Sequence, residues 1–133
     1  MNNTTTTNNI IVIAAGPVSV QAELNDKPTA KQIWDALPIQ GWANTWGDEV
    51  YFEIPVKAGQ EPDARQEVAV GELGYWPVGH AFCIFFGPTP ASTDERPRAY
   101  SPVNIVGRVA GDAAQFRAIK DGARVSLARK DRL

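Results

Sequence analysis

Apolar and polar residues alternate with a period of two along much of the chain, the pattern of strands that bury one face. Residues 18–24 show it best, with Val, Val, Ala and Leu at every second position and Ser, Gln and Glu between them. The apolar run 10–15 comes just before, and Gly16-Pro17 separates the two runs. Together these residues predict a hairpin near the start of the chain.

Two segments show helical spacing instead. The run 29–37 places apolar residues three and four positions apart and is stopped by Pro38. The run 113–119 follows Asp112, a residue type that caps helices. We expect two short helices whose inner stripes are buried against the core: Ile33, Trp34, Leu37, Phe116 and Ile119.

Short apolar runs bounded by Gly and Pro predict the remaining strands, with a loop rich in Pro and charge over 87–102. These runs cover 42–46, 49–54, 68–70, 75–77, 81–86, 103–109 and 125–127. Many short strands with turn signals indicate a mostly β sandwich or barrel. The 133 residues fit one domain over 10–129, with a flexible polar tail at 1–9 and a short tail at 130–133.

Charge and cysteine content narrow the possible partners. The net charge is −2, so no overall cationic field favours nucleic acid. The basic residues from Arg124 onward lack interleaved aromatic residues and favour a solvated terminus over a nucleic-acid patch. The single cysteine, Cys83, lies in an apolar run and is interpreted as a small buried hydrophobe rather than a catalytic thiolate. No stretch suits a membrane span or a signal peptide, so a cytoplasmic location is expected.

Several strings recur together in one known family. They are Asn-Thr-Trp-Gly at 44–47, Glu-Val-Tyr-Phe at 49–52, Gly-Tyr-Trp-Pro at 74–77, Phe-Phe-Gly-Pro-Thr-Pro at 85–90 and Val-Asn-Ile-Val-Gly at 103–107. The chain resembles, over about 10–127, a small prokaryotic group of cyclophilin-like proteins, the DUF369 or TM1367-like family. This resemblance implies a closed eight-stranded antiparallel barrel with a short helix capping each end. The family is largely uncharacterised, so the resemblance informs the fold more than the function.

True cyclophilins isomerise peptidyl-proline bonds with an arginine beside an apolar proline pocket. Their typical strings Phe-His-Arg, Gln-Gly-Gly-Asp and Asn-Gly-Ser-Gln-Phe-Phe are absent, and no arginine precedes Arg65. Arg108, on the expected strand 103–109, is the nearest stand-in. We therefore expect no efficient prolyl isomerase activity.

Aromatic residues cluster at 75–76 and 82–86, and about half of them should fill the core, because successive side chains on a strand point to opposite faces. The others could form a pocket wall, with polar contacts from neighbouring turns. Asn44 and Thr45 could equally bind adjacent loops, and the lone histidine could be structural. The predicted ligand-binding residues are Asn44, Thr45, Tyr75, Trp76, His80 and Phe86.

The sequence gives little indication of acid–base catalysis or of a metal site. Glu49 and Glu53 share one face of a strand and could act as a pair of carboxylates, but a solvated outer face explains them more simply. No metal-ligand spacing, phosphate loop or nucleophile motif is present, so no metal or cofactor is expected.

Three functions remain open. We favour a binding module for a small molecule or an extended, proline-containing peptide. The alternative is an enzyme, either a divergent prolyl isomerase or a hydrolase-like protein, the latter by fold analogy alone. A third possibility is an oligomer whose aromatic patch forms the interface.

Overall fold

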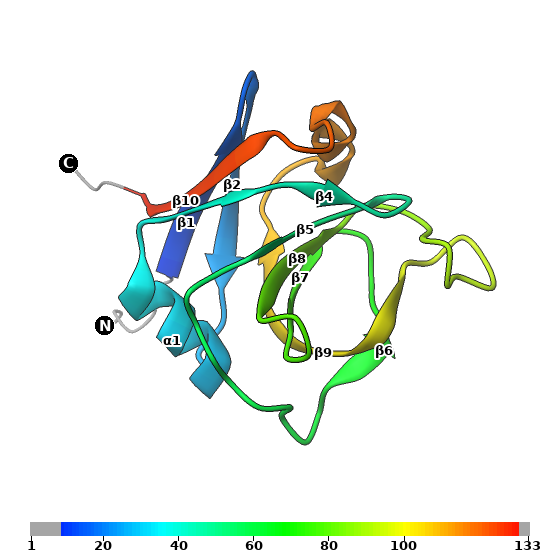
Figure 1. Cartoon of the computed structure of the whole chain (residues 1–133), viewed down its shortest axis with the longest axis horizontal. Helices are drawn as coiled ribbons and strands as arrows, with labels where there is room; N and C mark the ends of the chain where they lie inside the picture. The colour runs from blue at the N-terminus through cyan, green and yellow to red at the C-terminus, as the bar shows by residue number, and fades with distance from the viewer. Residues whose placement is uncertain (1–8, 131–133) are drawn as a thin grey trace, which may run out of the picture.

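The computed structural model describes residues 9–130 (Figure 1). The tails predicted at 1–9 and 130–133 lie outside this range apart from Asn9 and Lys130. No helix in the described part is long and apolar enough to cross a bilayer. The elements, in chain order, are β1 (Asn9–Ala15), β2 (Val18–Leu24), α1 (Pro28–Ala36), β3 (Ile39–Trp42), β4 (Asn44–Thr45), β5 (Glu49–Glu53), β6 (Arg65–Glu67), β7 (Glu72–Trp76), β8 (Ala81–Phe85), β9 (Arg98–Val109), the 3-10 helix η2 (Ala113–Ala118) and β10 (Arg124–Arg129).

The strands form one antiparallel sheet in the order β3-β10-β1-β2-β9-β7-β8-β5-β4, with β6 paired to β9. The predicted hairpin is confirmed, since β1 pairs with β2 along its whole length. The mostly β class is confirmed as well. The prediction of a closed eight-stranded barrel is wrong in two respects, because the described sheet has ten strands and its edge strands β3 and β4 are not paired with each other.

One residue, Ala43, divides the segment that was predicted as a single strand over 42–46. Its backbone N–H donates to the Ala123 carbonyl at 2.7 Å, and its carbonyl accepts from the Gly122 N–H at 2.7 Å. These bonds turn the chain between β3 and β4, so that β3 pairs with β10 and β4 pairs with β5. The two edges of the sheet are therefore formed by one short stretch of chain.

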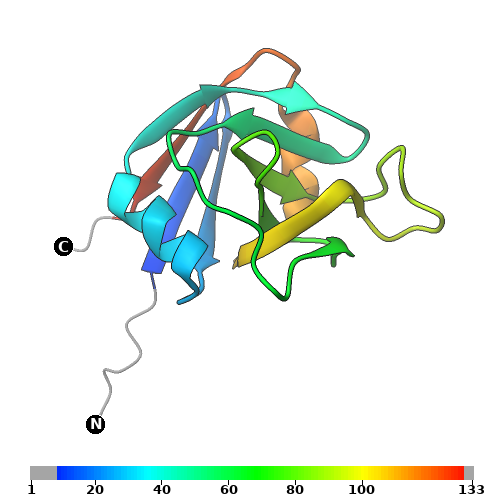
Figure 2. The same cartoon turned by 60° about the horizontal axis from the view of Figure 1, so that its bottom comes forward.

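The main core lies inside the curved sheet, and the two helices lie at opposite ends of it (Figures 1 and 2). The burial predicted for Ile33, Phe116 and Ile119 is confirmed. Trp34 and Leu37 are only half-buried. The Arg129 guanidinium lies 4.4 Å from the centroid of the Trp34 ring, so the half-buried indole makes a cation–π contact at the surface.

A second, smaller core lies on the outer face of the sheet. β8 is buried on both faces, because Phe82 and Ile84 belong to the main core while Cys83 and Phe85 belong to the outer one. The outer core is covered by β6 and by the first half of β9, which begins inside the segment predicted as a loop. The strand predicted at 68–70 is replaced by β6 just before it. This second layer is where the candidate site lies.

Candidate functional site

A cavity of about 250 Å³ opens beside the outer core. Its wall is mainly apolar and comes from β5, β7, β8 and β9, together with the turn between β4 and β5. We call it the aromatic cavity, and it is lined by Trp46, Glu49, Tyr51, Trp76, Cys83, Ala99, Tyr100 and Val103. One concave apolar surface that contains a polar group is the usual form of a ligand site.

Four aromatic rings follow one another around this cavity. The Trp46 and Tyr100 centroids are 6.0 Å apart, and those of Trp76 and Tyr100 are also 6.0 Å apart. Tyr51 continues the series at 6.3 Å from Trp76. All three pairs meet edge to face, an arrangement that the ring quadrupole favours. Each ring is therefore positioned by its neighbours.

Trp76 is also held by polar and steric contacts. Its indole Nε1–H donates to the Ser101 hydroxyl at 2.6 Å. Gly79, in the turn after β7, lies against the same ring, and a Cβ there would come within 2.6 Å of two ring carbons. A side chain at position 79 would thus displace the indole, so this turn requires glycine.

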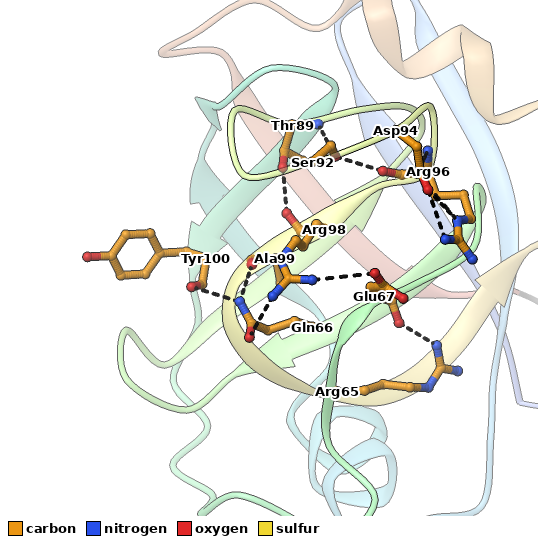
Figure 3. A network of polar contacts seen from close by, with 10 residues as sticks. All are labelled: Arg65, Gln66, Glu67, Thr89, Ser92, Asp94, Arg96, Arg98, Ala99 and Tyr100. Carbon is orange, nitrogen blue, oxygen red and sulfur yellow. Dashed lines mark hydrogen bonds and ion pairs between the residues drawn. The ribbon is translucent and has the colours of Figure 1, made fainter.

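Tyr100 forms the outer wall and is 71% exposed. Its backbone is anchored from the other side by the polar contacts of Figure 3. The Gln66 amide donates to the Ala99 carbonyl at 3.1 Å and to the Tyr100 carbonyl at 3.3 Å. The Arg98 guanidinium contacts Gln66 and Glu67 on β6, and the Arg98 carbonyl accepts from the Thr89 hydroxyl. These bonds fix β9 against β6, while the phenol of Tyr100 points away from them (Figure 3).

Glu49 is the acidic group of the cavity and is only 5% exposed. Burial raises the pKa of its carboxyl to about 7, and a hydrogen bond with the Cys83 thiol offsets part of that rise. Its Oε1 has no hydrogen-bond partner within residues 9–130. Among the residues that the structure describes, no Lys, Arg or His lines the cavity. A buried carboxyl in this state is costly, since its Oε1 lacks a donor and no counter-charge lies in the cavity wall.

The interpretation of Cys83 as a buried residue is confirmed, since its side chain is only 2% exposed. Burial and the nearby Glu49 carboxyl raise the pKa of its thiol well above the usual value. A thiol that keeps its proton is a weak nucleophile. Cys83 therefore contributes a neutral wall to the cavity.

The residues predicted as ligand-binding do not gather around one cavity. Trp76 lines the aromatic cavity, whereas Tyr75 points to the main core, donates its hydroxyl to the Val56 carbonyl and is fully buried. Phe86 is also in the main core, with its ring 6.3 Å from that of Phe116.

The polar residues of that prediction lie elsewhere. Asn44 and Thr45 are exposed on β4, where Asn44 donates to the Tyr51 carbonyl and Thr45 bonds with Asp121. His80 sits in the turn before β8 with a φ of 50°, and its carbonyl accepts from the Ile54 N–H. None of these three lines the aromatic cavity. The contacts of Asn44 and Thr45 to other segments of the chain are of the kind that the structural alternative expects.

Of the polar and aromatic residues that line the cavity, four were not assigned to the site from the sequence: Trp46, Glu49, Tyr51 and Tyr100. Glu49 is the one that was interpreted differently. Its interpretation as part of a solvated outer face is wrong, although Glu53, four residues further, is exposed. A signal was present, because Glu49 alternates in phase with Tyr51 and the segment follows Trp46. Within residues 9–130, no three His, Cys, Asp or Glu side chains come together as a metal site.

The antiparallel sheet with a helix at each end defines a class of domain that known proteins share. The cyclophilin-like family model matches residues 9–128, and the chain belongs to this family. It is similar to the solution structure of the hypothetical protein AF2241 from Archaeoglobus fulgidus, with 34% identity and a TM-score of 0.78. The match covers 92% of this chain and 95% of that one. No curated protein matched the chain.

Proposed function

We propose that this protein is a binding module whose aromatic cavity takes one small chemical group of its ligand. The observation that carries the proposal is the Glu49 carboxyl, which is buried in an apolar cavity with its Oε1 unpartnered. Such a group destabilises the folded state unless a ligand completes its hydrogen bonding. Buried titratable groups with a shifted pKa in a concave site are typical of functional positions.

The cavity suits a ligand fragment better than a whole drug-sized molecule. Pockets for such molecules measure roughly 300–1,000 Å³, whereas this cavity measures about 250 Å³. The rest of the ligand would extend past the exposed Tyr100 ring. Either a small molecule or one side chain of an extended peptide meets this requirement.

The tryptophans provide a direct test by nuclear magnetic resonance. Trp46 and Trp76 line the cavity, while Trp34 and Trp42 lie outside it and serve as internal controls. In a screen of small amines, amides, alcohols and acids, we expect hits to move the indole N–H signals of the first pair. Hits that move only the second pair, or signals of β10, would contradict the assignment of the site.

The alternative function, a divergent prolyl isomerase, receives less support from the geometry. Arg108 is paired across the sheet with Glu72, at the opposite end of β7 from Trp76. It lines a separate hollow with Glu23 and Glu72. We therefore propose that the protein binds without efficient isomerase activity.

A further inference from the structure

The Oε1 atom of the Glu49 carboxyl has no hydrogen-bond donor among the described residues. The Trp76 indole N–H in the cavity wall is already bonded to Ser101, and none of the other wall donors is bonded to Oε1. The Cys83 thiol is a weak donor. Since Oε1 has no partner within residues 9–130, the ligand group must bring its own N–H or O–H.

The four aromatic rings line the same cavity as this carboxyl, and an aromatic ring attracts positive charge over its face. Trp46, Tyr51, Trp76 and Tyr100 each carry a negative electrostatic potential on the ring face. Cations placed over such faces are attracted by about 0.5–2 kcal/mol, more strongly when water is excluded. The same faces repel an anion and offer nothing specific to a neutral acceptor.

The other titratable groups around Glu49 do not oppose a cation. Tyr51, Tyr100 and Cys83 line the cavity and are neutral when protonated. Asp48, the preceding residue, is paired with Arg117 at 3.0 Å. No positively charged side chain of the described residues lines the cavity, so its only possible charge is the negative charge of Glu49.

From these contacts we infer that the group taken by the cavity is an organic ammonium with at least one N–H, held by Glu49 and enclosed by the four rings. This inference rests on the proposed binding function and names its ligand class. The ammonium fills the open hydrogen-bonding position of Oε1 and supplies the missing counter-charge. Its alkyl carbons contact the indole and phenol rings. Such a group occurs both in free amines and in lysine side chains.

The test compares matched probes on the intact chain. The probes are n-butylammonium and n-butanol, which have the same carbon chain and differ in charge. Binding is followed through the Trp46 and Trp76 indole signals, with Glu49→Gln as the test variant and Glu53→Gln as the control on the same strand. Glu53 is exposed and lies outside the cavity. Dispersed amide spectra confirm that each variant is folded.

We expect n-butylammonium to bind at least about tenfold more tightly than n-butanol, and Glu49→Gln to remove that preference while Glu53→Gln keeps it. An alkylammonium stays protonated below about pH 10. Its binding should therefore tighten about tenfold between about pH 5.5 and about pH 8.5, as Glu49 loses its proton, and should be flat in Glu49→Gln.

The other outcomes distinguish a failure of the ammonium inference from a failure of the proposed binding function. If both probes bind equally, or if binding weakens as the pH rises, the ammonium inference is overturned and the binding function stands. If no probe of the screen moves the Trp46 or Trp76 signal, both fail. If n-butylammonium binds as expected, Nα-acetyl-lysine amide distinguishes the two sources of the ammonium group. Tighter binding than n-butylammonium indicates a peptide lysine, and equal or weaker binding indicates a free amine.

Discussion

At the scale of single residues, Glu49 is a titratable carboxyl in a position that excludes water. Its position in β5 places it on the outer face of the sheet, where Phe85 lies directly opposite and Cys83 lies beside it. Those neighbours exclude water, and exclusion of water penalises the charged carboxylate. The folded protein consequently holds the Glu49 proton more tightly than the unfolded chain does. Its stability must then depend on pH.

The sign of this dependence follows from the pKa, which rises on folding from 4.5 to about 7. The folded state binds more protons in that window, so stability falls as the pH rises through it and levels off above it. The difference amounts to roughly 3 kcal/mol for Glu49 alone. Urea unfolding at pH 5 and pH 8 should show that Glu49→Gln loses this decrease.

Glu53→Gln is the matched control, because Glu53 is exposed on the same strand. It should retain the full decrease between the two pH values. An equal pH dependence in wild type and Glu49→Gln would mean that the Glu49 carboxyl is solvated in the folded protein.

At the scale of elements, the alternation of residues predicts a strand well when only one of its faces is buried. β2 is such a strand, with buried and more exposed positions in strict turn, and it was predicted with its observed bounds. β8 is different, since all five of its residues are buried. No periodicity distinguishes its two faces, so the pattern could not separate core residues from cavity residues.

The same reason explains why the site was only partly predictable. Tyr75 and Trp76 are neighbours in the sequence, but Tyr75 lies in the main core and Trp76 lines the cavity. Which of the two meets the cavity depends on the strands that cover each face, and these come from distant parts of the chain. Glu49 likewise owes its burial to pairing with β8 and to the covering segment of β9.

The contact between β6 and β9 gives an element-scale prediction. Gln66→Ala removes both amide hydrogen bonds to the Ala99 and Tyr100 carbonyls. Each such bond contributes about 0.5–1.5 kcal/mol, so unfolding should require about 1–3 kcal/mol less. We also expect faster hydrogen exchange at 98–101 and weaker ligand binding, because the Tyr100 wall loses its anchor.

Glu67→Gln serves for comparison, since it alters only the exposed ion pair with Arg98. Exposed pairs contribute little, and its stability should change by less than about 1 kcal/mol. If Gln66→Ala were as stable as this variant, with unchanged exchange at 98–101, β9 would be held by other contacts.

At the scale of the whole molecule, two groups of strands meet where β2 pairs with β9. Gly107 makes this approach possible, because a Cβ there would lie 2.1 Å from the Glu23 carbonyl oxygen. The junction places Arg108 beside Glu23 and Glu72, while the aromatic cavity lies further along the sheet. The geometry thus separates the candidate arginine from the candidate pocket.

Prolyl isomerisation requires the arginine and the apolar pocket in one place. The uncatalysed barrier is about 20 kcal/mol, and each tenfold acceleration must remove about 1.4 kcal/mol of it. A donor aimed at the imide nitrogen should supply much of that reduction in an isomerase. In a protease-coupled proline-peptide assay, we expect a rate indistinguishable from background. Acceleration comparable to that of a true cyclophilin, abolished by Arg108→Ala, would place the protein among the enzymes.

The position of β10 in the sheet also determines when the molecule can be completed during its synthesis. β10 lies between β1 and β3, pairing with both, yet it is made after every other strand of the sheet. While the ribosome translates the preceding residues, β1 and β3 each present an unpaired strand edge. Such edges attract other chains. These two edges of the nascent protein therefore stay open to misassembly until β10 has emerged and paired with them.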